Sequence, residues 1–287
     1  MANLKEIRNR ISSVSSTMQI TSAMKMVSAA KLKKAQDAII GMRPYAEKLN
    51  LLLENAMTNL DDHSANKFFE KRPVKKVLVV AITSNRGLCG AFNANVLKEI
   101  NIIKTKPEYK SSTFDYFTIG KKVTDSLSRT EKIIQNESEL FDDLNYDKVS
   151  NVAESLMSLF LDEKYDKIEI VYNSFKNAAT QIIKSEQFLP IANQNENSSN
   201  NSNYIFEPSQ EFIINNLIPK SLKIQLFKAV RDSFASEHGA RMTAMHKATD
   251  NASELRDELK LTYNKARQAS ITNEILEIVG GAEALNN

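Results

Sequence analysis

The stretch VLVVAITSNRGLCGAFN (77–93) is the part of the chain that most readily suggests chemistry, because an apolar run there meets a loop with two glycines. Gly87 and Gly90 stand where a strand-to-helix turn could offer backbone N–H groups to a phosphate. GLCG, however, matches neither G-x-G-x-x-G nor G-x-x-x-x-G-K-[ST], and Ala91 and Phe92 follow where a lysine would be needed. We predict that Gly87 and Gly90 form a structural loop, with a weak phosphate site as the alternative.

Thiol, imidazole and metal chemistry find little support in the sequence. Cys89 is the single cysteine, so no internal disulfide can form, and no histidine lies near it in sequence. His238 and His246 are eight residues apart, whereas two imidazoles that share a metal on one helix are usually four apart. We expect surface or packing roles for these two histidines and for His63. The sequence therefore predicts no catalytic residue, no bound cofactor and no metal site.

Length and composition describe a soluble protein of one or two domains. The chain has 287 residues and a net charge of +3, so nothing in the charge balance favours a nucleic-acid partner. No apolar run reaches the roughly 18 residues that a membrane span needs, and the N-terminus lacks the apolar core of a signal peptide. We expect membrane association only through partner proteins, and a reducing compartment.

Both ends of the chain are nearly free of helix-breaking residues. Gly41 is the first glycine, and after Pro219 only Gly239, Gly280 and Gly281 interrupt the sequence. Apolar and small residues recur in steps of three and four over residues 4–42 and again over 242–269, which is the seam of a coiled coil. We predict a coiled-coil helix over 1–58 and a C-terminal segment, 209–287, whose long helix begins near 219. Each helix would be about 80–90 Å long, and the two would pair as an antiparallel coiled coil.

The segment MQITSAMKMVSAA (18–30) differs from an ordinary seam. Its apolar residues point around nearly the whole circumference of a helix. A two-helix coil can cover only one of these faces. We therefore expect this part of the coil to lie inside another protein; a bundle formed within the chain is the alternative.

The middle of the chain, 74–190, reads as an α/β globular domain. Strands are predicted over 76–83, 114–120, 167–175 and 180–190, with helices over 91–104 and 147–162. This alternation favours a small, mostly parallel sheet. Residues 191–208 follow it, and their Asn-rich stretch ANQNENSSNNSN (192–203) predicts a mobile loop.

The ends of the chain carry a specific resemblance. KEIRNRISSVSSTMQITSAMKMVSAAKL near the start and SEHGARMTAMHKATDNASELRDELKLTYNKARQASITNEILEIVGGAEAL near the end resemble the gamma-subunit family of F-type ATP synthases, and SNRGLCGAFN resembles that family's central loop. The resemblance spans nearly the whole chain. It implies α/β structure plus a long antiparallel coiled coil, in which the terminal helices pair and the middle domain is Rossmann-like.

The resemblance also implies a function and its partners. The chain would be the rotor shaft that couples rotation of a c-subunit ring to conformational change at catalytic beta subunits, without catalysis of its own. Partners would be the alpha and beta subunits, the epsilon subunit and the c-ring, at the cytoplasmic face of the bacterial inner membrane. Contacts with beta would come from Met24, Lys25, Met26, Arg267, Gln268 and Thr272, and Lys31, Lys33 and Lys34 would pass the acidic lever of beta.

Two other classes of protein compete with this interpretation. A dinucleotide-dependent enzyme would explain the strand and glycine loop, but the fingerprint is missing and two long terminal helices would have no role. A filament protein of the flagellin type also pairs its terminal helices. The all-round apolar segment at 18–30 and the compact α/β middle argue against the filament.

Overall fold

The computed structural model describes residues 4–58, 67–70, 72–191, 207 and 210–285. The chain forms two compact units, one made of Met1–Ser28 with Met242–Asn287 and the other of Ala29–Arg241. We call them the terminal unit and the central unit. The predicted Asn-rich loop (192–203) and His63 lie outside the described residues.

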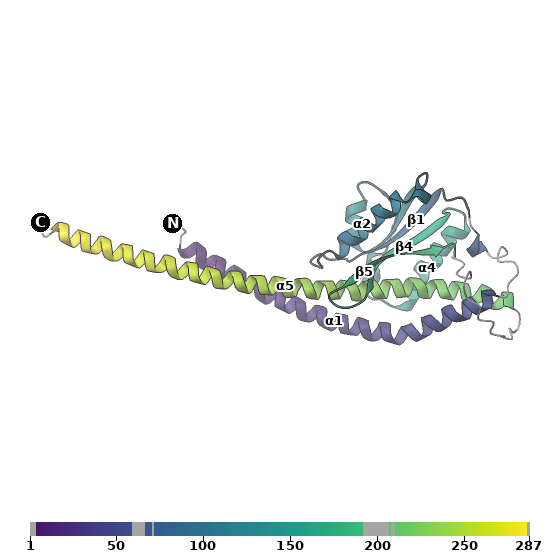
Figure 1. Cartoon of the computed structure of the whole chain (residues 1–287), viewed down its shortest axis with the longest axis horizontal. Helices are drawn as coiled ribbons and strands as arrows, with labels where there is room; N and C mark the ends of the chain where they lie inside the picture. The colour runs from purple at the N-terminus through teal and green to yellow at the C-terminus, as the bar shows by residue number, and fades with distance from the viewer. Residues whose placement is uncertain (1–3, 59–66, 71, 192–206, 208–209, 286–287) are drawn as a thin grey trace. The chain divides into compact units, whose positions relative to one another are not determined.

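The central unit is built on a five-stranded sheet in the order β3-β2-β1-β4-β5. Figure 1 labels β1, β4 and β5 of this sheet. β1, β2, β3 and β4 are parallel, whereas β5 pairs antiparallel with β4. The strands are β1 (Lys76–Ile82), β2 (Thr113–Ile119), β3 (Lys132–Asn136), β4 (Lys167–Phe175) and β5 (Gln181–Leu189). The predicted mostly parallel sheet is confirmed.

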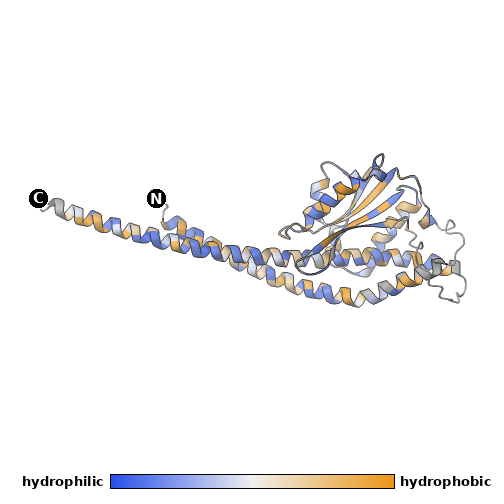
Figure 2. Cartoon of the chain, in the orientation of Figure 1, coloured by the Kyte–Doolittle hydropathy of each residue, from blue (hydrophilic) through white to orange (hydrophobic). Residues whose placement is uncertain are grey.

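β1 lies at the centre of the sheet and is buried on both faces. After Lys76 every residue of β1 is buried, as expected for a parallel strand covered by helices on both sides. Figure 2 shows the resulting hydrophobic strands. Val77 and Val79 pack on one face against α2 (Phe92–Thr105) and α3 (Lys121–Leu127).

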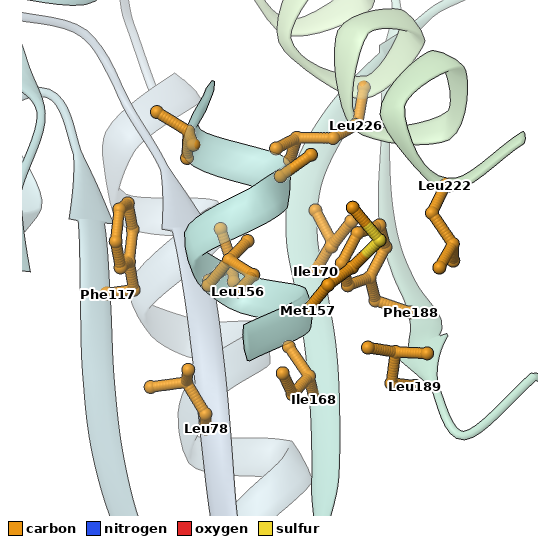
Figure 3. Close-up of a cluster of buried hydrophobic side chains, with 14 of the residues drawn as sticks. Leu78, Phe117, Leu156, Met157, Ile168, Ile170, Phe188, Leu189, Leu222 and Leu226 are labelled. Atoms are coloured by element: carbon orange, nitrogen blue, oxygen red, sulfur yellow. The ribbon is translucent and has the colours of Figure 1, made fainter. Parts of the chain in front are cut away.

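The opposite face of the sheet is covered by α4 (Tyr146–Leu161) and by part of α5 (Gln210–Leu285). In Figure 3, Leu156 and Met157 of α4 gather with strand residues and with Leu222 and Leu226 of α5. The Asn145 side chain caps α4 by accepting a hydrogen bond from the backbone N–H of Lys148 at 2.9 Å. The predicted helices over 91–104 and 147–162 are confirmed as α2 and α4.

Several short elements were not predicted from the sequence. β3 is a half-exposed edge strand, and α3 has seven residues, so neither spans enough periods to give a clear hydrophobic pattern. The described residues of the unit also form three short 3-10 helices: η2 (Lys67–Phe69), η3 (Pro107–Tyr109) and η4 (Ser138–Phe141).

The terminal helices are longer than their breakers suggest. α1 runs from Leu4 to Thr58 with Pro44 inside it, and α5 runs from Gln210 to Leu285 with Pro219 inside it. The prediction that the last helix begins near residue 219 is therefore wrong by about nine residues, because α5 begins at Gln210. Proline removes one backbone hydrogen bond, but burial of the neighbouring Ile218 and Leu222 in the sheet core offsets that loss.

The predicted seam of α1 is buried or half-buried in both units. In the terminal unit Ile7, Thr21 and Ser28 are buried. In the central unit Leu32, Ala35 and Ile39 continue the same spacing and are buried too, while Ala46 and Leu49 pack with Ile224 of α5. The heptad pattern thus marks the buried stripe of the helix correctly.

Gly120 gives a test of the central unit. Its φ is +106°, and a Cβ built on it would lie 2.2 Å from the carbonyl oxygen of Thr83. We expect Gly120→Ala to lower the free energy of unfolding by more than about 2 kcal/mol, because both the dihedral and the contact are forbidden to alanine. The matched control is Gly41→Ala, in open space within α1, which should raise stability by about 0.5–1 kcal/mol. Urea unfolding of the purified chain measures both, and equal midpoints for the two variants would contradict the prediction.

Candidate functional site

In the terminal unit α1 and α5 pair in antiparallel fashion. Positions that rise along α1 meet positions that fall along α5, as predicted. Three contacts set this register: Arg8 Nη2 donates to Tyr263 Oη (2.7 Å), Arg256 Nη1 donates to Met18 Sδ (3.6 Å), and the hydroxyls of Thr21 and Thr249 lie 2.8 Å apart.

The middle of the seam is polar yet satisfied. Thr21 and Ser28 donate their hydroxyls to backbone carbonyls of their own helix, at Met18 (3.1 Å) and Met24 (2.8 Å). Small side chains that hydrogen-bond within their own turn leave no buried polar group unpaired. The two helices can therefore stay together here without a wide apolar face between them.

The face of α1 away from the seam carries exposed apolar side chains. Ile20, Met26 and Val27 are between 58% and 65% exposed. A contiguous set of such side chains on a folded chain usually marks a protein interface. The apolar circumference predicted for 18–30 is thus present, and the terminal unit itself covers only part of it.

The last part of α5 is exposed on every side. Each described residue from 271 to 282 is exposed, and Figure 1 shows this part of the helix continuing beyond the first described turn of α1. Ile271, Ile275, Ile278 and Val279 recur at helical spacing, so they form one apolar face. A single helix of this length is only marginally stable in water. This face therefore calls for a partner.

The predicted beta-subunit contacts fall into two separate groups. Met24 and Lys25 are half-buried and Met26 is exposed, whereas Arg267, Gln268 and Thr272 are all exposed. Since Thr21 lies beside Thr249, the level of Met24 along α5 is near residue 246, about 30 Å from Arg267 at 1.5 Å per residue. The structure does not bring the two groups together.

The predicted lever contacts, Lys31, Lys33 and Lys34, lie on α1 within the central unit. All three are exposed, and Lys33 Nζ lies 3.7 Å from an Asp37 carboxylate oxygen one turn away. Such an exposed pair contributes little stability, so it leaves Lys33 available to another acidic group.

The loop that carries Gly87 and Gly90 connects β1 to α2 and is stabilised by its own hydrogen bonds. Leu88 and Gly90 have φ of 62° and 60°, which turns the chain sharply before Phe92 begins the helix. Ser84 Oγ donates to the Arg86 carbonyl at 2.7 Å, and Asn93 Oδ1 accepts from the Ser84 N–H at 3.1 Å. These bonds satisfy the groups that border the turn.

Cys89 is the only cysteine of the chain and is buried inside this loop. Its Sγ accepts from Asn93 Nδ2 at 3.3 Å, and burial raises the pKa of the thiol. A protonated, buried thiol is a poor nucleophile. The geometry is that of a packing residue.

A buried ion pair on α5 closes over the loop, and the sequence alone did not reveal it. Arg241 Nη2 donates to the carbonyls of Arg86 (3.1 Å) and Gly87 (3.3 Å), and its Nη1 donates to Glu237 at 2.6 Å. Both charged side chains are buried, and burial raises the pKa of Glu237 although Arg241 opposes this. The available signal was an i,i+4 Glu–Arg pair within a run of buried small residues.

The histidines have the expected roles where the structure describes them. His238 is buried, and its ring meets Phe234 edge-on with centroids 4.5 Å apart. His246 is exposed, with Nδ1 3.2 Å from Asp250. Within the described residues, no cluster of three or more His, Cys, Asp or Glu side chains could hold a metal ion.

Comparison with known proteins decides the family. The family described as ATP synthase matches residues 3–285. The ATP synthase gamma chain of Christiangramia forsetii is 65% identical over 286 residues, covering 100% of both chains, and that of Flavobacterium psychrophilum is 66% identical over 287 residues, covering 99% of both. The chain belongs to the ATP synthase gamma chain family. It is therefore a non-catalytic subunit, and both the dinucleotide-dependent enzyme and the flagellin-type filament are excluded.

Solved structures agree on the fold. A chain from the OSCP/F1/c-ring of the Euglena gracilis mitochondrial ATP synthase matches with a TM-score of 0.71 and 22% identity, over 98% of this chain and 94% of that chain. A chain from the rotor of the same synthase matches with a TM-score of 0.66 and 21% identity, over 93% and 98%. These chains therefore share the fold, with long terminal helices and a mostly parallel sheet. No helix among the described residues has the length and hydropathy to cross a membrane.

His238 makes the central unit sensitive to acid. Burial, helped by the positive charges of Arg241 and Lys31, lowers its pKa from 6.5 to about 3. Below pH 6.5 the imidazole is protonated in the unfolded chain but stays neutral in the folded chain. The free energy of unfolding is therefore highest above pH 6.5 and decreases between pH 6.5 and 3. The loss at pH 5 should be about 2 kcal/mol.

We expect His238→Leu to remove the loss of stability that protonation of His238 causes in acid. The loss is measured as the difference in the free energy of unfolding between pH 7 and pH 5. His246→Leu, at an exposed position, is the matched control and should keep the wild-type loss. A His238→Leu profile parallel to that of the wild type would show that the imidazole is not the group responsible.

Proposed function

We propose that this chain is the central rotor shaft of an F-type proton-translocating ATP synthase. It would couple rotation of a c-ring to sequential conformational change at the catalytic beta subunits. One observation carries the proposal: the terminal unit is folded, yet it exposes apolar side chains along the outer face of α1 and along α5 beyond residue 270. A surface of this kind fits a shaft that is enclosed by other subunits, and family membership supports the same role.

The mechanism follows from a mismatch of symmetry. A two-helix shaft presents a different set of side chains in each direction, whereas a ring of three alpha and three beta subunits surrounds it with threefold symmetry. Each beta subunit therefore experiences a different contact free energy, which biases its open and closed conformations differently. Rotation passes these biases from one beta subunit to the next, which is allosteric coupling through the shaft.

The contacts between a rotating shaft and the surrounding ring must not hold the shaft at one angle. Ile20, Met26 and Val27 offer apolar area without directional hydrogen bonds, and methionine adapts easily to changing surroundings. We propose that Met24, Lys25 and Met26 form a level of the shaft that slides against the ring.

Arg267, Gln268 and Thr272 differ in chemistry from this sliding level. The guanidinium and amide groups can make directional hydrogen bonds to loops of beta, while Thr272 Oγ1 donates to the Gln268 carbonyl at 2.9 Å. We propose them as a second, angle-dependent contact. Because the two levels are about 30 Å apart along α5, together they would also hold the shaft against tilting.

The remaining proposed contacts with partner subunits involve the central unit. We propose that Lys31, Lys33 and Lys34 pass an acidic segment of beta, where several exposed ammonium groups give attraction without a fixed geometry. The α/β domain would contact the epsilon subunit and the c-ring, which would place this subunit at the cytoplasmic face of the bacterial inner membrane as a peripheral protein.

The proposal predicts that apolar exposure in the terminal unit serves the alpha–beta ring. Val27→Asp should weaken assembly with isolated alpha and beta subunits at least about tenfold, because the new carboxylate would lose water on binding. Ile102→Asp, on α2 of the central unit, is the matched control, since Val27 and Ile102 are 58% and 54% exposed. Assembly is measured by titrating each chain into the ring and following the size of the complex.

Both variants should fold like the wild type, which circular dichroism of the isolated chains checks. Wild-type assembly by Val27→Asp, or equal weakening by Ile102→Asp, would contradict the enclosed shaft.

A further inference from the structure

The sheet of the central unit has a topology that in many proteins creates a ligand site. With the order β3-β2-β1-β4-β5, the chain leaves the carboxyl end of β1 toward β2 and the carboxyl end of β4 toward β5, on opposite sides. In open α/β sheets, ligands bind in the crevice at the carboxyl ends of the two strands where this reversal occurs. Here those ends are the 83–91 loop after β1 and the end of β4.

α5 contacts this edge of the sheet at several points. Three of them come from polar or small residues within one stretch of about ten residues. They are Asp232, whose Oδ2 accepts from Ser174 Oγ of β4 at 3.1 Å; Ala240, which packs with Cys89 and Phe92; and Arg241, which binds the carbonyls of Arg86 and Gly87. The place at which open α/β sheets bind a ligand is thus contacted here by the chain's own helix α5.

Gly239 shows how closely the helix approaches. A Cβ built on Gly239 would lie 3.2 Å from both the Cα and the carbonyl oxygen of Ala178, in the turn between β4 and β5. Glycine inside a helix lowers its stability. Its presence in α5 is explained by this approach, which leaves almost no room for a side chain.

The polar contacts of Arg241 restrict the motion of α5 more than apolar packing would, because hydrogen bonds are directional. A guanidinium that binds two carbonyls and a carboxylate has a defined orientation, so it fixes both the rotation of α5 about its axis and its position along that axis. Glu237 and Arg241 are each 7% exposed, so water cannot readily replace these bonds. Arg241 is also the last residue of α5 that belongs to the central unit.

We propose that Asp232, Glu237, Gly239 and Arg241 form a clasp with Ser174, Ala178 and the 86–89 loop, through which the sheet domain sets the rotational position of α5. The inference rests on the proposed function, since the clasp would carry torque from the α/β domain into the shaft. Arg241 is then a positioning residue: it touches no reacting group, but it fixes the element that must turn with the domain.

The clasp is tested with Arg241→Lys in the assembled synthase. Lysine keeps a positive charge beside Glu237 but cannot bind both carbonyls and the carboxylate in one geometry. The matched control is Lys223→Gln, which removes the bond of Lys223 to Glu154 elsewhere on α5. Gly239→Ala is a second clasp variant that changes no charge.

Cys89 supplies the first readout, because it is the only cysteine of the chain and is 1% exposed. Its reaction with a maleimide, followed by the mass of the separated subunit, should be about tenfold faster in Arg241→Lys, since the loop opens more often. Gly239→Ala should change the rate in the same direction, and Lys223→Gln should react at the wild-type rate.

Proton pumping per ATP hydrolysed, in membrane vesicles, is the second readout. It should fall at least about twofold in both clasp variants, while ATP hydrolysis by the detached soluble complex stays near the wild-type rate, because catalysis on beta is untouched. Unchanged labelling, or faster labelling with unchanged pumping, would overturn the clasp. A wild-type complex that does not pump with this chain as its shaft would instead refute the proposed function, and it would leave the Cys89 result to be judged alone.

Discussion

The burial of one helix, α5, against two different surfaces is the interaction on which the structure depends. Ile218, Leu222 and Leu226 join the core of the central unit, and farther along Met245 and Ala252 are buried in the terminal unit. Most of the stability of a helix in a folded protein comes from packing of this kind. After residue 270 the apolar face of α5 continues, but its side chains are no longer buried. The terminal unit therefore exposes an apolar surface there.

The same helix explains why a Rossmann-like sheet serves here without a nucleotide fingerprint. The loop after β1 has the position of a phosphate-binding turn, yet the carbonyls of Arg86 and Gly87 are bound by Arg241. A phosphate would need backbone N–H groups and a free approach to them. At this edge of the sheet the loop after β1 is held by residues of α5.

Periodicity and composition were sufficient for the large features. The seam of α1, the long breaker-poor ends and the buried run of β1 each repeat over many residues, so their patterns predict the elements reliably. β3 and α3 are too short for such a pattern. The sequence predicts too late a start for α5 because proline usually marks a helix boundary, whereas burial of Ile218 and Leu222 stabilises the helix across Pro219. The i,i+4 spacing of Glu237 and Arg241 is visible in the sequence, but their burial and the contact of Arg241 with the 86–89 loop depend on tertiary packing. The distance between Met24 and Arg267 depends on the register of the two helices, which one sequence does not encode locally.

Photo-crosslinking can show whether foreign chains enclose the terminal unit. A photoreactive amino acid at Met26 or at Gln268, two exposed positions on different levels of the coil, would be activated in the intact complex in cells. We expect adducts with alpha or beta subunits from both positions. Positions that react only with water and yield no adduct to another chain would contradict it.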